Sequence, residues 1–314
     1  MRNEKKSRIR KDNFLANDSR YFLAVIAAGS VRAASRKLNV AASAISRQIA
    51  NLEAEVGIAL FDRKGRALAL SAAGKILAQG LQAASLAHGE AIEELNALNG
   101  LRSGFIRIAT VESVSVEVLP RLLQGFSKLY PGICFQVEVA GSDAVTALVR
   151  DQKVDLGFTF NPRSLSGLDV VAKQGLRVCA VMHPHHQLAS AKSLTLAQCL
   201  THPVAWPSEG LSLRSILDKA LGELRLSPFI ECNSLRLMSS LAKLGQCIAF
   251  QTTIGIEQEL RAGTLVALPL KGSAIATDQL MVVIRAGRPA RLALEAVVDH
   301  IAEHFRGIST VLKK

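Results

Sequence analysis

The chain has 314 residues, of which 49% are apolar and 20% are charged. This composition excludes collagen-like, fibrous and disordered proteins, and the length predicts two or three folded domains. Lys and Arg outnumber Asp and Glu by 38 to 26, and residues 1–75 alone hold 15 basic and 6 acidic residues. A basic block beside a nearly neutral remainder indicates a polyanionic partner, with nucleic acid as the first candidate and a membrane surface as the second.

Cysteine usage and the apolar runs indicate a cytoplasmic protein. The five cysteines are odd in number, widely spaced and without a C-x-x-C pair, so we expect free thiols rather than disulfides or a zinc site. No apolar run reaches the roughly 18–20 residues that span a bilayer, so we expect no membrane contact. A basic start before residues 21–28 resembles a signal peptide, but Asp12, Asp18 and Arg20 interrupt it.

Apolar spacing in the first eighty residues predicts a helix-turn-helix. Asp18 is a candidate N-cap for a first helix that ends at Gly29, and Ser30 can cap a second helix over about 31–38. A third helix over about 42–55 carries an apolar stripe on one side and small or polar residues on the other. Two short helices joined by a tight turn, the second with a thin polar face, favour DNA binding.

The next segments predict a hairpin and a long helix. Residues 58–70 read as a short hairpin, and Ser71 is placed to cap a helix that reaches about Asn99. Basic side chains at the hairpin tip suit phosphates or a minor groove. Along the helix, apolar residues alternate in steps of four and three, which predicts a two-chain coiled coil; alternatively the stripe packs on the chain's own body. The seam residues are Leu77, Leu81, Ala84, His88, Ala91, Leu95 and Leu98.

From Gly104 onward, short apolar strands alternate with helices. This alternation predicts an α/β fold with largely parallel sheets. The expected first set has strands at 105–109, 135–139 and 155–160 with a helix at 143–150, and the chain returns through a strand at 279–284 and a helix at 289–306. The expected second set has strands at about 168–182, 203–206, 229–232 and 246–250.

Ligands of open α/β sheets bind at the carboxyl ends of the strands, beside helix N-termini. Glu112 in such a place disfavours an acidic ligand, and Trp206 suits a core position as well as a ligand platform. The residues that we expect at such ligand-binding positions are Thr110, Glu112, Ser113, Phe160, Asn161, Trp206, Ser208, Phe250, Gln251 and Thr252.

No constellation indicates an enzyme. The sequence has no G-x-S-x-G, no phosphate-binding G-x-x-x-x-G-K-[ST] and no dinucleotide fingerprint after a strand. His183, His185 and His186 lack carboxylate or cysteine neighbours at a useful spacing, and His300 and His304 fit a solvated helix face. We therefore expect no catalysis, no metal and no cofactor.

A dense, ordered set of N-terminal residues resembles the LysR-type transcriptional regulators. The matching residues include Phe22, Gly29-Ser30, Ala33-Ala34, Leu38, Ala44–Ile49, Leu52-Glu53, Gly57, Leu60-Phe61, Arg63, Ser71 and Gly74. Later matches are less sharp and include Leu119-Pro120, Tyr130-Pro131, Val154–Gly157 and Gly263–Val266.

The resemblance implies a multidomain protein: an α-helical winged helix-turn-helix N-terminal domain plus an α/β two-lobed, periplasmic-binding-protein-like C-terminal domain. The DNA-binding domain is expected at 15–74, a dimerising linker helix at 72–99 and an effector-binding domain at 103–306. Lobe I is expected at about 103–163 and 270–306, and lobe II at about 164–269.

The resemblance also implies roles for individual residues at the DNA. Base or nearby phosphate contacts fall to Ser43, Ser46, Arg47 and Gln48, and backbone contacts to Ser30, Arg32, Arg63, Lys64 and Arg66. The family often begins its recognition helix with Ser-Gln or Thr-Gln, whereas this chain has Ala41-Ala42. The chain therefore lacks a hydrogen-bonding cap and an amide that reads adenine. Cys247 is a second departure, in a loop where the family commonly has glycine.

The sequence therefore predicts a sequence-specific transcriptional regulator of the LysR type, controlled by a small-molecule effector between two lobes. The expected partners are double-stranded promoter DNA, the effector and further copies of the chain in a homodimer or homotetramer, with RNA polymerase as another candidate. One alternative is a non-specific nucleoid-associated DNA-binding protein, and site-specific binding would distinguish the two. A solute-binding protein is the other alternative, and the missing export signal and the basic N-terminal block disfavour it.

Overall fold

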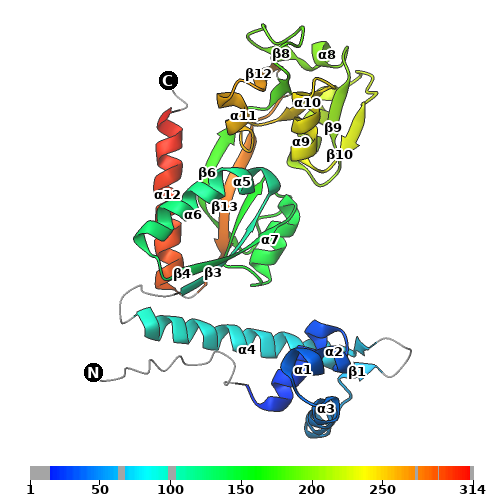
Figure 1. Cartoon of the computed structure of the whole chain (residues 1–314), viewed down its shortest axis with the longest axis vertical. Coiled ribbons are helices and arrows are strands. Elements are labelled where there is room, and N and C mark those ends of the chain that lie inside the picture. Colours follow the sequence, from blue (N-terminus) through cyan, green and yellow to red (C-terminus); the bar gives the residue numbers. More distant parts are fainter. Residues whose placement is uncertain (1–14, 63–67, 98–103, 273–274, 289, 312–314) are drawn as a thin grey trace. The chain divides into compact units, whose positions relative to one another are not determined.

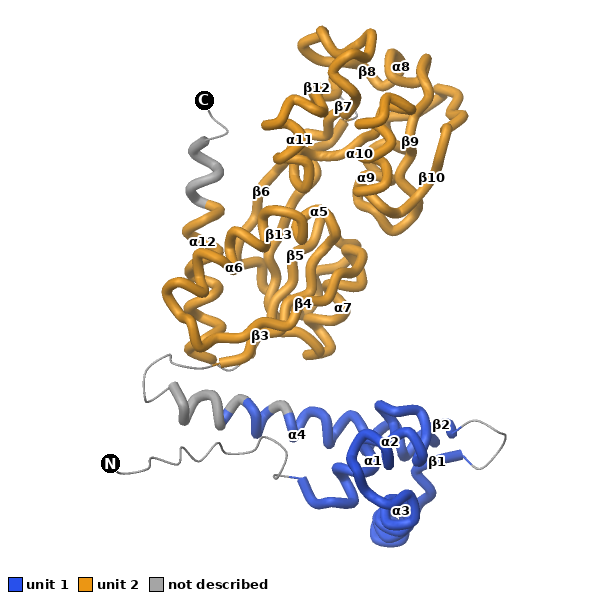
Figure 2. The backbone as a smooth tube through the Cα atoms, viewed as in Figure 1, with its two compact units in different colours: residues 1–95 blue, residues 96–314 orange. Residues whose placement is uncertain are grey.

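The computed structural model describes residues 15–62, 68–97, 104–272, 275–288 and 290–311. It divides into two compact units, residues 1–95 and 96–314 (Figure 2). The boundary between the units falls within the long helix expected at 72–99. Among the described residues, no helix combines the length and apolar character needed to cross a membrane.

The first unit begins with helices packed around a small apolar core (Figure 1). The helices predicted at 31–38 and 42–55 are present with at most one residue of difference. The first helix starts earlier than predicted: Ala16 is its N-cap and Asp18 lies inside the first turn, so the assignment of Asp18 as N-cap was wrong. The helix dipole stabilises a carboxylate in the first turn as well as at the N-cap, so the sequence alone does not distinguish these two positions for Asp18. The helices are α1 (Asn17–Ala28), α2 (Val31–Leu38) and α3 (Ala42–Val56).

A short antiparallel hairpin follows, and its base is tied to both neighbouring helices. The hairpin strands are β1 (Phe61–Asp62) and β2 (Ala69–Leu70), and they are followed by the long helix α4 (Ala72–Ala97). Ser71 caps α4 as predicted, because its Oγ accepts a hydrogen bond from the Gly74 N–H at 3.0 Å. Position 74 requires glycine, since a Cβ there would lie 2.1 Å from the Leu60 carbonyl oxygen. On the α3 side, the Glu53 carboxylate accepts a hydrogen bond of 2.7 Å from the Leu60 N–H.

The second unit contains two α/β lobes, each built on a mixed sheet (Figure 1). In the first sheet the order is β4-β3-β5-β13-β6, with β3 parallel to β4 and β5, and β13 antiparallel to β5 and β6. Every residue of β5 is buried, as in a central strand covered on both faces. The strands are β3 (Gly104–Thr110), β4 (Ile133–Val139), β5 (Leu156–Phe160), β6 (Leu168–Leu176) and β13 (Asp278–Arg285), and the helices are α5 (Glu112–Val116), α6 (Val118–Leu129), α7 (Ser142–Arg150) and α12 (Leu292–Val311).

In the second sheet the order is β10-β9-β11-β7-β12-β8. Here β9 is parallel to β10 and β11, whereas β7 is antiparallel to β11 and β12. The strands are β7 (Cys179–Met182), β8 (Leu194–Thr195), β9 (Val204–Pro207), β10 (Ile230–Cys232), β11 (Ile248–Gln251) and β12 (Val266–Lys271), and the helices are α8 (Leu196–Cys199), α9 (Ser212–Leu221), α10 (Leu235–Lys243) and α11 (Glu257–Arg261).

The two sheets differ from the sequence-based expectation in direction and in boundary. They are mixed rather than largely parallel, because β7 and β13 are antiparallel yet as apolar as a parallel core strand. The stretch expected as one strand at 168–182 divides, since β6 pairs along its length with β13 in the first sheet while β7 lies in the second. Lobe II of the structure therefore begins near residue 177 and continues through β12, later than the expected 164–269. Periodicity identifies a strand but does not identify its neighbour.

Candidate functional site

The outward face of α3 is the candidate DNA-reading surface of the first unit. Ile45, Ile49 and Leu52 are buried in the core. On the opposite side Ser43, Ser46, Arg47 and Ala50 are exposed, and Gln48 is partly buried. Ala41 is the N-cap of α3 and makes no side-chain hydrogen bond, so the first backbone N–H groups of α3 lack a side-chain cap. The sequence therefore places its small and polar residues on one accessible face of one helix.

The residues expected to hold the DNA backbone fall into two groups. Ser30 caps α2, because its Oγ accepts a hydrogen bond of 3.1 Å from the Ala33 N–H, and Arg32 next to it is exposed. Arg63, Lys64 and Arg66 lie outside the described residues, so their contribution stays a prediction from the sequence.

The expected coiled-coil seam divides into an inner and an outer part. Leu77 and Leu81 are partly buried against the apolar core of the first unit. Ala84 and Ala91 are exposed and His88 is partly buried. The side chain of Leu95 and all of Leu98 lie outside the described residues. The first two seam positions thus pack in part on the chain's own body, whereas Ala84 and Ala91 present an open surface.

A cleft of about 360 Å³ lies between the two lobes of the second unit. This volume lies in the range of small-molecule sites. Lobe I lines it with the ends of β3, β4 and β5 and the start of β13, and lobe II with the loops that lead into α9 and α10. The lining residues are Val111, Glu112, Ser113, Val139, Ala140, Gly141, Ser142, Phe160, Glu209, Gly210, Leu211, Ser212, Leu213, Asn233, Ser234, Leu235, Thr252 and Asp278.

The structure brings some of the expected cleft residues together and separates others. Glu112, Ser113, Phe160 and Thr252 line the cleft, while Gln251 lines a smaller hollow behind it. The remaining expected residues are not in the lining, and these are Thr110, Asn161, Trp206, Ser208 and Phe250.

Trp206 and Phe250 belong to the core of lobe II. Both are fully buried, and their rings pack edge to face with the ring centroids 5.5 Å apart. Along β9, Ala205 and Trp206 contribute to different core clusters, because successive side chains of a strand point to opposite faces. Trp206 points to the face that α9 covers, where its indole N–H donates to Asp218 Oδ1 at 3.4 Å. Of the two roles that the sequence allowed for Trp206, the structure shows the core position rather than the ligand platform.

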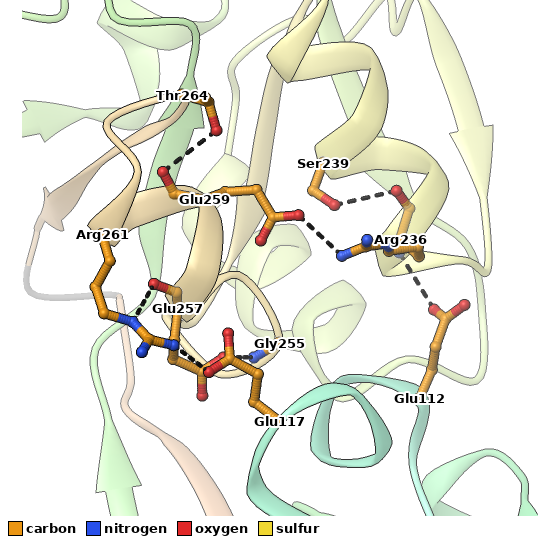
Figure 3. A network of polar contacts seen from close by, with 9 residues as sticks. All are labelled: Glu112, Glu117, Arg236, Ser239, Gly255, Glu257, Glu259, Arg261 and Thr264. Atoms are coloured by element: carbon orange, nitrogen blue, oxygen red, sulfur yellow. Dashed lines mark hydrogen bonds and ion pairs between the residues drawn. The ribbon is translucent and has the colours of Figure 1, made fainter. Parts of the chain in front are cut away.

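The carboxylate of Glu112 crosses from lobe I to the first turn of α10. Ser234 Oγ donates to Glu112 Oε1 at 3.0 Å. The Arg236 backbone N–H donates to Oε2 of the same carboxylate at 3.3 Å (Figure 3). A carboxylate at a helix N-terminus is favoured both by the free N–H groups and by the helix dipole. Glu112 therefore binds lobe II with its own side chain.

Asp278 is a second carboxyl group at the cleft, and it is only 2% exposed. It accepts hydrogen bonds from Asn161 Nδ2 at 2.8 Å and from Ser212 Oγ of lobe II at 3.1 Å. Burial raises the pKa of the Asp278 carboxyl to about 7, against the opposing effect of the Ser212 hydrogen bond. Asn161 thus acts on the cleft indirectly, through Asp278.

An ion pair and a close backbone contact join the lobes behind the cleft (Figure 3). Glu117 of lobe I is 4% exposed and accepts from Arg261 of α11. Within lobe II, Arg236 donates to Glu259 at 3.0 Å. Gly255 packs so closely on Ser113 that a Cβ at position 255 would lie 2.9 Å from the Ser113 carbonyl oxygen. Lobes I and II are therefore in direct contact along this side.

Sequence reasoning missed Ser212, Ser234 and Asp278. The first two follow β9 and β10, so the same strand-end rule that selected Glu112 would have found them. Asp278 begins an antiparallel strand whose start lies beside the end of β5, and only the pairing of β13 with β5 reveals this. Among the described residues, no group of three or more His, Cys, Asp or Glu side chains is placed to hold a metal ion.

Comparison with known proteins gives the same division of the chain. A family model described as "Bacterial regulatory helix-turn-helix protein, lysR family" matches residues 16–75, and one described as "LysR substrate binding domain" matches residues 99–306. A probable RuBisCO transcriptional regulator of Synechocystis sp. is 26% identical over 304 residues, covering 93% of this chain and 87% of that protein. A probable nitrogen assimilation transcriptional activator of Synechococcus elongatus is 30% identical over 232 residues, covering 72% and 75%. The crystal structure of full-length CbnR with its target DNA aligns with a TM-score of 0.66 at 18% identity, covering 91% of this chain and 98% of that one.

A helix-turn-helix unit with an exposed polar helix face, followed by a two-lobed α/β unit with a ligand-sized cleft, defines a DNA-binding transcription regulator with an effector-binding domain. The two family models together cover most of the chain. The protein belongs to the LysR family of transcriptional regulators.

Proposed function

We propose that this regulator binds a roughly two-fold symmetric operator as a homodimer, with one α3 in the major groove of each half-site. The observation that carries the proposal is the exposed face of α3, where Ser43, Ser46 and Arg47 stand clear of the core. Side chains of this size and polarity let a helix approach base edges closely, and a dimer places its two recognition helices about 34 Å apart. CbnR, whose fold is similar, was crystallised with its target DNA.

The effector-binding role falls to the cleft between the lobes. A small molecule enclosed there would touch α5 of lobe I and the first turns of α9 and α10 of lobe II. A ligand that contacts both lobes favours one lobe arrangement over another, and it shifts the equilibrium by its difference in affinity for the two. In this proposal the favoured arrangement sets the geometry of the dimer on the promoter.

Assembly completes the proposed function. Ala84 and Ala91 offer an open stripe on α4 to a second copy of the chain. Pairs of such dimers would form a tetramer that bends promoter DNA, and RNA polymerase would be the partner at the promoter. The protein would act in the cytoplasm by binding, without a catalytic step.

The experiment is a footprint of the purified protein on the DNA upstream of its own gene. Random competitor DNA is present in excess and the salt is about 150 mM, because non-specific binding weakens steeply with salt. We expect a protected region with two-fold symmetry. Uniform or absent protection would contradict sequence-specific regulation and would favour the nucleoid-associated alternative.

A further inference from the structure

We propose that the effector of this regulator is a cation with hydrogen-bond donors, a primary ammonium or guanidinium compound, rather than a carboxylate. This inference rests on the proposed function, because it takes the cleft between the lobes as the effector site. It goes further by naming the charge that this cleft selects.

The charges on the cleft walls have one sign. Among the described lining residues, the ionisable side chains are Glu112, Glu209 and Asp278, and no Lys or Arg is present. Burial raises the pKa of Asp278 to about 7, so this carboxyl group is fully charged only above that pH. Glu209 is exposed and has no polar partner among the described residues. Its carboxylate is therefore available to a ligand, and a second carboxylate brought beside it would be repelled.

The protein itself fills one of the anion sites that α/β folds usually offer, the N-terminus of α10. Among the described residues, the helices of eight or more residues that begin at the cleft are α7, α9 and α10. Glu112 accepts from Ser234 Oγ and from the Arg236 N–H at α10. At α9, Asp278 accepts from the Ser212 hydroxyl, and at α7 the Asp143 carboxylate pairs with Arg163. Neither α7 nor α9 has a side-chain cap on its first backbone N–H groups.

Glu112 removes the attraction of the α10 terminus for an anionic ligand. Helix N-termini attract anions through free N–H groups and the positive end of the dipole. At α10 the Glu112 carboxylate supplies this negative charge from within the molecule. An incoming carboxylate would have to displace Glu112 there and approach the exposed Glu209, whereas an ammonium group would find acceptors already in place.

The remaining lining favours a ligand with a hydrocarbon chain. Aliphatic and aromatic side chains form one part of the wall, with Val139, Phe160 and Leu211 among them. Hydroxyl groups of Ser142 and Thr252 add further acceptors. Apolar walls with a few convergent polar groups are typical of small-molecule sites. The fitting ligand therefore has a short hydrocarbon body and at least one cationic end.

The test uses the full-length protein and three probes with the same four-carbon chain: 1,4-diaminobutane, 1,4-butanediol and succinate. A set of longer primary amines and guanidinium compounds is measured beside them, all at equal concentration and matched ionic strength. The readouts are the thermal unfolding midpoint and the heat of titration. We expect amines or guanidinium compounds to raise the midpoint, and succinate and the diol to leave it unchanged.

Variants connect the binding to the cleft. Glu209→Gln should weaken the affinity of the best cationic probe about two- to fivefold, the range of an exposed charge pair. Glu223→Gln is the matched control, because Glu223 is an exposed residue of lobe II outside the cleft lining. Equal affinity in the two variants would overturn the assignment of the cation to this cleft. Stabilisation by succinate or by the diol, or by none of the cationic compounds, would overturn the inferred charge.

The footprint separates this inference from the proposed function. If succinate binds and changes the footprint, the regulator mechanism stands and the cationic effector is wrong. If a cationic compound binds in the cleft without changing the footprint or the DNA affinity, the charge selection stands and the proposed control by this cleft is wrong.

Discussion

Ser234 Oγ lies 3.0 Å from Glu112 Oε1, and this hydrogen bond joins residues that are 122 positions apart in the chain. One residue begins α5 of lobe I and the other is the N-cap of α10 of lobe II. The Arg236 N–H adds a second donor to the same carboxylate. The lobes are thus connected through the charged end of one side chain and the free end of one helix.

The first prediction concerns this connection. Glu112→Gln removes the charge from the α10 terminus and should lower the free energy of unfolding by about 1–2 kcal/mol, the value of a charge-assisted bond at a helix end. Glu209→Gln is the matched control, because it changes a cleft glutamate without a polar partner among the described residues. Urea unfolding of both variants measures the difference. Equal stability of the two would show that the Glu112 contact does not hold the lobes.

The second prediction concerns Asp278 and pH. Its folded-state pKa of about 7 lies above the ordinary value of 3.8, so the folded protein retains a proton that the unfolded chain releases. The corresponding stability is complete below about pH 4 and is lost as the pH rises through about 7. Asp278→Asn has no titrating group at this position and does not lose this stability. Between pH 5 and pH 8, wild type should therefore lose about 1–3 kcal/mol more of its free energy of unfolding than Asp278→Asn does.

The measurement is urea unfolding of wild type and Asp278→Asn at both pH values. Other titrating groups contribute equally to the two proteins and cancel in the difference. Asp151→Asn, at an exposed position of lobe I, serves as control and should follow wild type at both pH values. A constant difference between Asp278→Asn and wild type across this range would contradict a raised pKa.

The third prediction concerns base recognition by α3. Arg47→Ala should cost about 1–3 kcal/mol of binding free energy on the operator and little on random DNA, if its exposed guanidinium reads a base. Competition measured by fluorescence anisotropy gives both affinities. Arg225→Ala removes the same charge from an exposed position of lobe II and should change neither. An equal loss on both DNAs would instead make Arg47 a phosphate contact.

The fourth prediction concerns the dimer. Ala84→Arg combined with Ala91→Arg places two charges on the exposed part of the seam and should give monomers in sedimentation velocity. These positions do not contribute to the described core, so the fold of the monomer should persist. Gln79→Arg with Ala83→Arg adds the same charge to exposed positions of α4 outside the seam. Dimers that persist in the seam variant would place the interface elsewhere.

The sequence predicts features that depend on neighbouring residues better than features that depend on residues far apart in the chain. The bounds of α2 and α3 follow from local spacing and caps, and they agree to within one residue. The ends of β3 and β5 likewise predict Glu112, Ser113 and Phe160 at the cleft. Trp206 could not be placed, because the face of β9 on which it lies depends on how α9 packs there. The role of Asp278 depends on strand pairing between residues more than a hundred positions apart, for which periodicity carries no information.

The base of the hairpin in the first unit connects α3 to α4 through hydrogen bonds and close packing. Ser71 donates from its Oγ to the Ala59 carbonyl at 2.7 Å, Gly74 leaves no room beside Leu60, and Glu53 binds the Leu60 N–H from the end of α3. These contacts tie the first turn of α4 to the last turns of α3. We expect α3 and α4 to rotate together, because a relative movement would break these hydrogen bonds or bring position 74 into collision with Leu60. In the proposed dimer, a change in the angle between the two α4 helices would therefore change the orientation of both α3 faces without a rearrangement inside the DNA-binding units.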